Sequence, residues 1–222
     1  FGKATAMYTS WASHLEASVP LLLKDVAGLV PGAWQGLGKG NRFLNDLCDA
    51  AVLIHVVDAS GCADAQGRIE GDDVVDVSVA AKDVVWIWRE VHMWVFHNVM
   101  AKWPSPRKQH LDASAAVCAL FSGYGATARM VQRAARLAEL DLALAKTFAR
   151  EDVHRLVAFF TRLRFPVVVG LNKADKLTPE QLSAVVRSIG PGPAAVVPFS
   201  ALAEEALLAR KVGSKPPPHS DR

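Results

Sequence analysis

The sequence predicts an α/β fold in which a parallel sheet is interrupted by a long helical insertion. Short apolar runs at residues 21–23, 50–57, 165–171 and 194–198 are typical of strands, and each leads into a polar or glycine-containing segment. From residue 60 to about 165, apolar residues instead recur at helical steps of three and four. We therefore expect three parts, namely a partial sheet domain (1–59 and 165–212), an inserted helical domain (60–164) and a flexible tail (213–222).

The spacing of the polar segments supports the insertion independently. Asp25 and Asn172 are 147 residues apart, whereas two βα units of roughly 30 residues each would need only about 60. The excess falls between the strand ending at Asp58 and the strand beginning near Pro166. The chain segments on either side must therefore rejoin in one parallel sheet.

Composition excludes few classes of protein. The chain has 222 residues, of which 51% are hydrophobic and 21% charged, and its formal charge is +3. The basic residues are spread along the chain, which permits contact with nucleic acid or the ribosome without indicating it. No apolar run is long enough to span a membrane, and the first residues are not a signal peptide. The odd number and wide spacing of Cys48, Cys62 and Cys118 favour free thiols and a reducing, cytoplasmic location.

The first eighteen residues show little periodicity, and we expect an irregular lead-in there. Gly2-Lys3-Ala4-Thr5 resembles the end of a phosphate-binding loop, GxxxxGK followed by Ser or Thr. We reject that interpretation because no strand precedes it, the hydroxyl residue comes one position late, and too few residues separate it from Asp25. Since Phe1 is not a start methionine, we expect the chain to be a fragment.

Asp25 and the loop behind it are the first candidate site. The apolar run before it predicts a buried strand, and loops at strand ends carry the ligand-binding residues of parallel sheets. Asp25 and Gly28 form a D-x-x-G motif, followed by Leu29, Trp34 and a stretch rich in glycine. Phe43 to Leu47 then indicates the beginning of a short helix.

The run that ends at Asp58 is almost unbroken in aliphatic and β-branched residues. We expect a central strand that is covered on both faces. His55 within it is more typical of a core histidine than of a ligand, because other side chains must first converge on it.

The helical stretch begins with apolar residues at helical spacing from Val84 to Val99, and Pro104 and Pro106 stop that helix. Four of the six tryptophans lie on it, which indicates a packed core more than a partner or membrane surface. A second helix is expected over 107–121, a break over 121–127, and one or two helices over 128–163. The arginines of this region are typical of a solvated face.

The third apolar run leads into the second candidate site, Asn172-Lys173-Ala174-Asp175. Thr178 and Pro179 then predict a helix start. After the strand at 194–198, Ser200 and Ala201 lead into a final helix near 202–211.

Together these motifs indicate nucleotide binding. Asp25 would lie near magnesium, and the amide of Gly28 near a γ-phosphate. The carboxylate of Asp175 can accept two hydrogen bonds from the N1–H and N2–H₂ edge of guanine, which adenine lacks. Lys173 would cover the nucleotide with its aliphatic stem, Asn172 would tie the motif to neighbouring loops, and Ser200 and Ala201 would close over the base. The alternative is an ordinary polar turn that ends a strand.

The segment from Asp25 to Gly61, DVAGLVPGAWQGLGKGNRFLNDLCDAAVLIHVVDASG, together with FSGYGAT and NKAD, resembles the Obg-like, YchF-related P-loop GTPases. Within that family the chain is most similar to the archaeal and eukaryotic branch that keeps N-K-x-D. The resemblance implies a P-loop NTPase-type sheet, GTP and magnesium as cofactors, and GTP hydrolysis by the complete protein. It also implies a helical hairpin used for partner contact and points to the ribosome or RNA as a partner.

The sequence departs from the family at two places. Leu29 stands where many Ras-like enzymes have a water-orienting glutamine, and in this the chain resembles the group that has an apolar residue there. In YchF-related proteins a histidine in the following loop is the candidate substitute, and this chain has Trp34 at that place. An indole donates a hydrogen bond but is no base. The second departure is that the 222 residues contain no phosphate-binding loop, no switch threonine and no counterpart of the family's C-terminal domain, so we expect the isolated fragment to bind nucleotide weakly or not at all. A degenerate, non-hydrolysing interaction protein is the alternative function, and no pattern indicates an oligomeric state.

Overall fold

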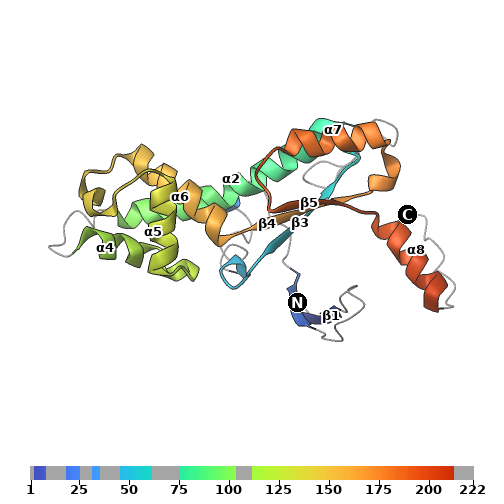
Figure 1. Cartoon of the computed structure of the whole chain (residues 1–222), viewed down its shortest axis with the longest axis horizontal. Coiled ribbons are helices and arrows are strands. Elements are labelled where there is room, and N and C mark those ends of the chain that lie inside the picture. Colours follow the sequence, from blue (N-terminus) through green and yellow to red (C-terminus); the bar gives the residue numbers. More distant parts are fainter. Residues whose placement is uncertain are drawn as a thin grey trace.

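The computed structural model describes residues 3–8, 19–25, 32–35, 46–61, 76–103 and 112–212. These residues form an elongated molecule with a sheet toward one end and a group of helices at the other (Figure 1). The elements, in chain order, are strands β1 (Lys3–Tyr8), β2 (Val19–Lys24), β3 (Leu53–Asp58), β4 (Val167–Asn172) and β5 (Ala195–Pro198), α-helices α2 (Val77–Lys102), α4 (Ala113–Leu120), α5 (Ala128–Leu137), α6 (Arg150–Arg164), α7 (Pro179–Ile189) and α8 (Ala201–Val212), and 3₁₀ helices η1 (Ala33–Gln35), η2 (Ser122–Tyr124), η3 (Leu142–Thr147) and η4 (Ala174–Lys176).

Three of the strands form a parallel sheet in the order β3-β4-β5. His55 pairs with Val169, and Val169 in turn pairs with Val196 on the other neighbour. Because the strands are parallel, the chain must cross over between them. α7 is the crossover between β4 and β5, and the connection from β3 to β4 contains α2, α4, α5 and α6. The predicted fold class, an α/β parallel sheet interrupted by helices, is confirmed.

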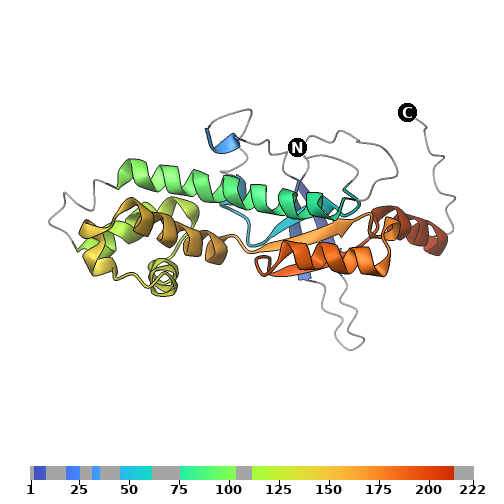
Figure 2. The same ribbon diagram turned by 90° about the horizontal axis from the view of Figure 1, so that it is seen from above.

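The described residues pack around two hydrophobic cores. One lies among the helices, with Phe96, Phe121, Leu156 and Phe160 fully buried at its centre. The other lies between the sheet and the pair α2 and α7, and it contains Val84, Val169, Leu171 and Val185 among others. α2 contributes to both cores, and it runs along α6 and then α7 in the view from above (Figure 2).

The helix and strand ends follow from local chemistry. The side chain of Asp76 accepts a hydrogen bond from the amide of Ser78 at the start of α2, and the helix ends at Lys102, just before the two prolines. Thr178 and Gln181 form a capping box at the start of α7, with Pro179 in its first turn. The predicted end of α2 and the predicted start of α7 are confirmed, whereas the start of α2 at Asp76 was not predicted.

Three predictions about strands were wrong. Residues 3–8 are not an irregular lead-in, since β1 pairs with β2 as an antiparallel ribbon, from Lys3 with Lys24 to Tyr8 with Val19. Six residues with weak alternation carry little local signal, because the partner strand supplies the hydrogen bonds. The same pairing puts Lys3 to Thr5 in extended structure, in agreement with our rejection of a phosphate-binding loop there.

β2 is also not a buried strand of the parallel sheet, because Leu22 and Leu23 are 64% and 52% exposed. β3 is an edge strand among the described residues, and it is covered on one face only. Val57 packs under α2, whereas Ile54 and Val56 are 61% and 56% exposed on the opposite face. A run of aliphatic residues predicts a strand in an apolar environment, but it does not show which elements cover each face of that strand.

The tryptophan-rich helix packs internally as predicted. Trp94 and Trp103 are buried in the helical core, and Trp88 packs against the sheet core. Within the ranges that the structure describes, no helix combines the length and the apolar character needed to cross a bilayer. The expected tail at 213–222 lies outside the described residues.

Candidate functional site

The parallel sheet brings the ends of β3, β4 and β5 to one edge. Asp58 and Asn172 are the last residues of neighbouring strands, and they are paired in register. The amide of Ala59 donates to the carbonyl of Asn172 at 2.9 Å, which continues the ladder one residue past the strand. The carboxyl edge of a parallel sheet is where ligand-binding loops gather, so the predicted Asn172–Asp175 motif lies at the expected position.

Asn172 holds two loops at this edge together. Its side-chain oxygen accepts hydrogen bonds from the amide of Lys173 at 2.8 Å and from the amide of Ala201 at 3.0 Å. The amide of Ala174 donates to the carbonyl of Phe199 at 3.1 Å, which adds a backbone link between the same loops. The structure therefore brings together three predicted site residues, Asn172, Lys173 and Ala201.

Phe199 fixes the approach of the second loop. A Cβ atom added to Gly170 would lie 2.9 Å from the Phe199 ring, closer than real Cβ contacts. Gly170 thus lets the Phe199 ring lie directly on β4. Ser200 follows, and its hydroxyl accepts a hydrogen bond from the amide of Ala203 at 3.2 Å in the first turn of α8.

Lys173 has a left-handed backbone conformation, with φ of 61°, which is uncommon for a residue other than glycine. Its ammonium group pairs with Asp58 across the strand ends, with 2.6 Å between Nζ and Oδ2. The Lys173 side chain nevertheless remains 42% exposed, so its stem lies open at the edge of the sheet. Unusual backbone geometry at a polar motif is typical of functional sites.

Asp58 is a site residue that the sequence analysis did not identify. Besides pairing with Lys173, its Oδ1 accepts hydrogen bonds from the amide and the hydroxyl of Ser60, at 2.9 and 2.6 Å. Burial acts to raise the pKa of this carboxyl, but the hydrogen bonds from Lys173 and Ser60 favour the charged form, and its pKa is lowered from the usual value. The sequence did contain a signal for this role, because Asp58 is an acidic residue at the end of a predicted strand.

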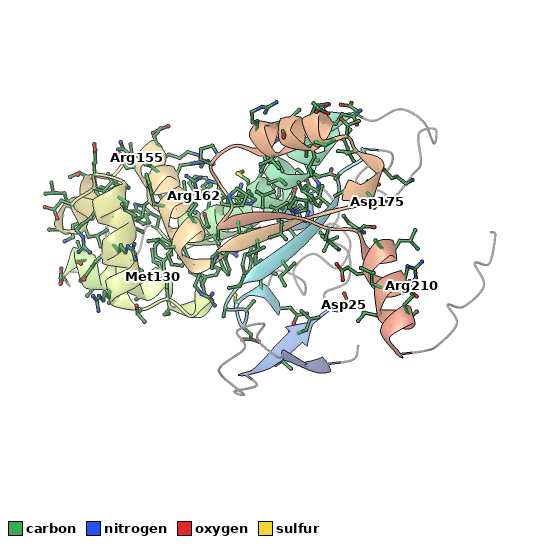
Figure 3. All side chains as sticks on the ribbon, turned by 45° about the vertical axis from the view of Figure 1, so that its right-hand side comes forward. Asp25, Met130, Arg155, Arg162, Asp175 and Arg210 are labelled. Carbon is green, nitrogen blue, oxygen red and sulfur yellow. The ribbon has the colours of Figure 1, made fainter. Side chains whose placement is uncertain are left out.

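Asp175 lies in η4, and its side chain is exposed. Among the described residues its carboxylate has no hydrogen bond or ion pair, in contrast to that of Asp58. Figure 3 shows Asp175 beyond the end of the sheet, on the side away from Met130 and Arg155 in the helices. An open carboxylate beside a constrained turn is available to an external donor.

Asp25 follows β2 and is exposed. In Figure 3 it lies toward the same end of the molecule as Asp175. Gly28 and Leu29, the other predicted residues of this motif, lie outside the described residues. Within the described part of the chain, no group of three or more His, Cys, Asp or Glu side chains is arranged to hold a metal ion.

Trp34 lies on the helices rather than at the edge of the sheet. It belongs to η1, and its ring stacks on His97 of α2 with 4.4 Å between centroids. Glu90, also on α2, accepts hydrogen bonds from the amides of Gly32 at 2.9 Å and Trp34 at 3.2 Å. Sequence reasoning missed Glu90, because a glutamate inside an amphipathic helix carries no local signal of a distant partner.

His55 behaves as a core residue. Its side chain is largely buried, and its Nδ1 has no hydrogen-bond partner. Burial lowers the pKa of His55 to about 4, which keeps the ring neutral at physiological pH.

The fold and the strand-end motifs define an α/β protein with a parallel sheet, a helical insertion and a polar site at the carboxyl edge. No family model matches the chain. It is 37% identical over 163 residues to the uncharacterized GTP-binding protein C428.15 of Schizosaccharomyces pombe, and these residues are 71% of this chain and 38% of that protein.

A second relative is the uncharacterized GTP-binding protein MJ1332 of Methanocaldococcus jannaschii, with 34% identity over 71% of this chain and 39% of the relative. GTPase Obg of Acetivibrio thermocellus is 37% identical over 32% of this chain and 15% of its own length. The chain is homologous to these proteins, and it spans less than two fifths of the length of the first two.

Among solved structures, the chain is similar to a GTP binding protein from Pyrococcus horikoshii OT3. The TM-score is 0.70 and the identity 27%, over 91% of this chain and 54% of that one. The fold described above is therefore also found in a protein with that name.

Proposed function

We propose that this chain is the base-recognition part, with the helical insertion, of a GTP-binding protein. The observation that carries the proposal is the joint between the two loops, in which Asn172 binds the amide of Ala201 and leaves the Asp175 carboxylate open beside it. An exposed carboxylate beside this joint can accept hydrogen bonds from the paired N1–H and N2–H₂ donors of guanine. The homology to proteins named as GTP-binding supports the same ligand.

The described residues fit the nucleotide at its base. Asp175 would bind the guanine edge, the exposed stem of Lys173 would cover the base, and Ser200 and Ala201 would close the pocket on the other side. The pairing of Lys173 with Asp58 supports this arrangement, because it fixes the end of the side chain and leaves the stem open.

Magnesium would bind at Asp25 through water, near the γ-phosphate. Mg²⁺ is usually bound by one or two carboxylates together with phosphate oxygens, so a single exposed acid fits this role only with the nucleotide present. The chemistry supplied by the ion would be neutralisation of charge on the phosphates during in-line attack of water. Gly28 would contribute its amide to the γ-phosphate.

We further propose that the complete protein hydrolyses GTP and works in the cytoplasm with the ribosome or another RNA partner. The alternative, an interaction protein that binds without hydrolysis, is favoured by one observation. Trp34 stacks on His97 and packs against the helical core, so its ring supports the loop and is not placed to activate water.

The test is nucleotide selectivity in the complete gene product. Competition against fluorescent GTP should show a strong preference for guanine over adenine nucleotides. Asp175→Asn should lose about 1 to 3 kcal/mol of GTP binding and gain affinity for xanthosine triphosphate, because the amide matches the altered base edge. Asp141→Asn, in the helical insertion, is the control. Equal binding of GTP and ATP, or unchanged selectivity in Asp175→Asn, would refute the proposal. For the 222-residue chain alone we expect only weak binding.

A further inference from the structure

Glu90 is a buried carboxylate with an unusual set of partners. It is 6% exposed and lies near the middle of α2. Each of its two oxygens accepts a hydrogen bond from a different backbone amide. Oε1 accepts from the amide of Gly32, and Oε2 accepts from the amide of Trp34. Both donors belong to the segment that begins seven residues after Asp25.

A carboxylate in this position satisfies a specific need. The first amides of a helical turn have no partner within the turn, and a buried amide without a partner destabilises the fold. Glu90 binds these amides at the start of η1 as an N-cap side chain would, although it comes from another element. Because both oxygens are used, glutamine, which has one oxygen, would leave one amide facing an NH₂ group.

A second contact attaches the same segment to α2. The Trp34 ring stacks on His97, which lies seven residues after Glu90 and therefore two turns further along the same face of the helix. The planes of the two rings are 28° apart. The segment is thus bound to α2 at two points, once through its backbone and once through a side chain.

α2 connects this segment to both cores. Its first half carries Ala80 and Val84 in the sheet core, and its second half carries Val95 and Val99 in the helical core. Glu90 lies between these two sets. If residues 32–34 are displaced, they must therefore either carry α2 with them or break the hydrogen bonds to Glu90.

We infer that Glu90 is a positioning residue that fixes residues 32–34 on α2, so that a nucleotide-dependent displacement of these residues is passed through α2 to the helical insertion. This inference rests on the proposed function. It extends that function because it names the contact by which the insertion would respond.

The attachment is tested first without nucleotide, by amide hydrogen exchange on the 222-residue chain. In Glu90→Gln and Glu90→Ala, the amides of Gly32 and Trp34 should exchange at least about tenfold faster, with the larger effect in Glu90→Ala. Glu205→Gln, an exposed glutamate of α8, is the matched control and should leave both rates unchanged. Unchanged rates at both amides in both Glu90 variants would overturn the attachment.

The coupling is tested with the complete gene product bound to GDP or to a non-hydrolysable GTP analogue. In the wild type, exchange over residues 86–100 should differ between the two nucleotides, and Glu90→Gln should reduce that difference while nucleotide affinity changes little. Trp34→Leu, which loses the stack but keeps its amide, should have a smaller effect. Equal exchange with both nucleotides would overturn the coupling even though nucleotide binds. If no guanine nucleotide binds, the proposed function and the coupling fail together, and the first experiment still decides whether Glu90 holds the loop.

Discussion

The side chain of Asn172 and the backbone amide of Ala201, 29 residues apart in sequence, are joined by a hydrogen bond of 3.0 Å. This bond fixes the start of α8 against the end of β4. The same oxygen also accepts from the amide of Lys173, which has a left-handed backbone. One side chain therefore determines the relative positions of both loops at the candidate site.

Replacing Asn172 tests that role. Asn172→Ala leaves two amides without an acceptor, so the free energy of unfolding should fall by about 1 to 3 kcal/mol in urea denaturation. Hydrogen exchange at Ala201 should also accelerate. Asn172→Asp keeps an oxygen for both amides and should lose much less. An alanine variant as stable as the wild type, with Ala201 still protected, would show that the backbone links suffice.

The ion pair between Asp58 and Lys173 predicts a pH dependence. The pKa of Asp58 is lowered in the folded state, so its contribution to stability is fully present above the ordinary pKa near 3.8 and is lost as the pH falls below that value. Asp58→Asn should lower stability at pH 7 by about 1 kcal/mol and make the acid limb of the profile shallower. Asp46→Asn, in the more exposed pair with Lys24, should change both quantities less. Parallel acid limbs in the wild type and Asp58→Asn would contradict this.

His55 predicts a second loss of stability on the acid side of the same profile, at higher pH than that of Asp58. Its pKa is about 4 when folded and near 6.5 when unfolded, so the unfolded state gains a proton first as the pH falls. Stability should therefore decrease from pH 6.5 to about 4, with a slope of up to about 1.4 kcal/mol per pH unit, and then level off with respect to this group. His55→Leu should reduce that slope in denaturant titrations at pH 7 and pH 5. His97→Gln serves as the control, and an unchanged slope in His55→Leu would mean that the ring is solvated.

The contacts of Arg164 on α6 predict a large loss of stability when this residue is replaced. Its guanidinium donates to the carbonyls of Ala50 at 2.9 Å, Tyr124 and Cys48, and so joins the chain before β3 to the end of η2. A lysine has no planar fork and cannot reach all three carbonyls, so Arg164→Lys should cost about 2 kcal/mol or more in the free energy of unfolding. Arg155→Lys, at an exposed pair on α6, should be close to neutral. A cost below that of Arg155→Lys would contradict the assignment.

Residues close in sequence allowed most elements to be predicted. Apolar spacing predicted α2, the prolines after Lys102 predicted the end of α2, and Thr178 with Pro179 predicted the start of α7. The junction of β4 with Asn172 was visible for the same reason, because a strand and its polar end are adjacent in the chain.

What could not be predicted depends on partners far along the chain. Nothing near Lys3 indicates that β2 will pair with it, and the composition of β3 does not reveal that Ile54 and Val56 are exposed. The contacts of Lys173 with Asp58 and of Glu90 with Gly32 span 115 and 58 residues. Such contacts exist only after the sheet and α2 have brought their elements together.

The number of residues in α2 between the two cores determines how the side chains of its two halves are oriented relative to each other. Val84 faces the sheet core and Val95 the helical core, and the step of 11 positions from one to the other makes close to three full turns. One residue inserted between them would rotate one end by about 100° relative to the other. Val84 and Val95 would then no longer face their cores together, and Glu90 would keep its orientation relative to only one of them. In this segment, the number of residues constrains the fold as strictly as their identity does.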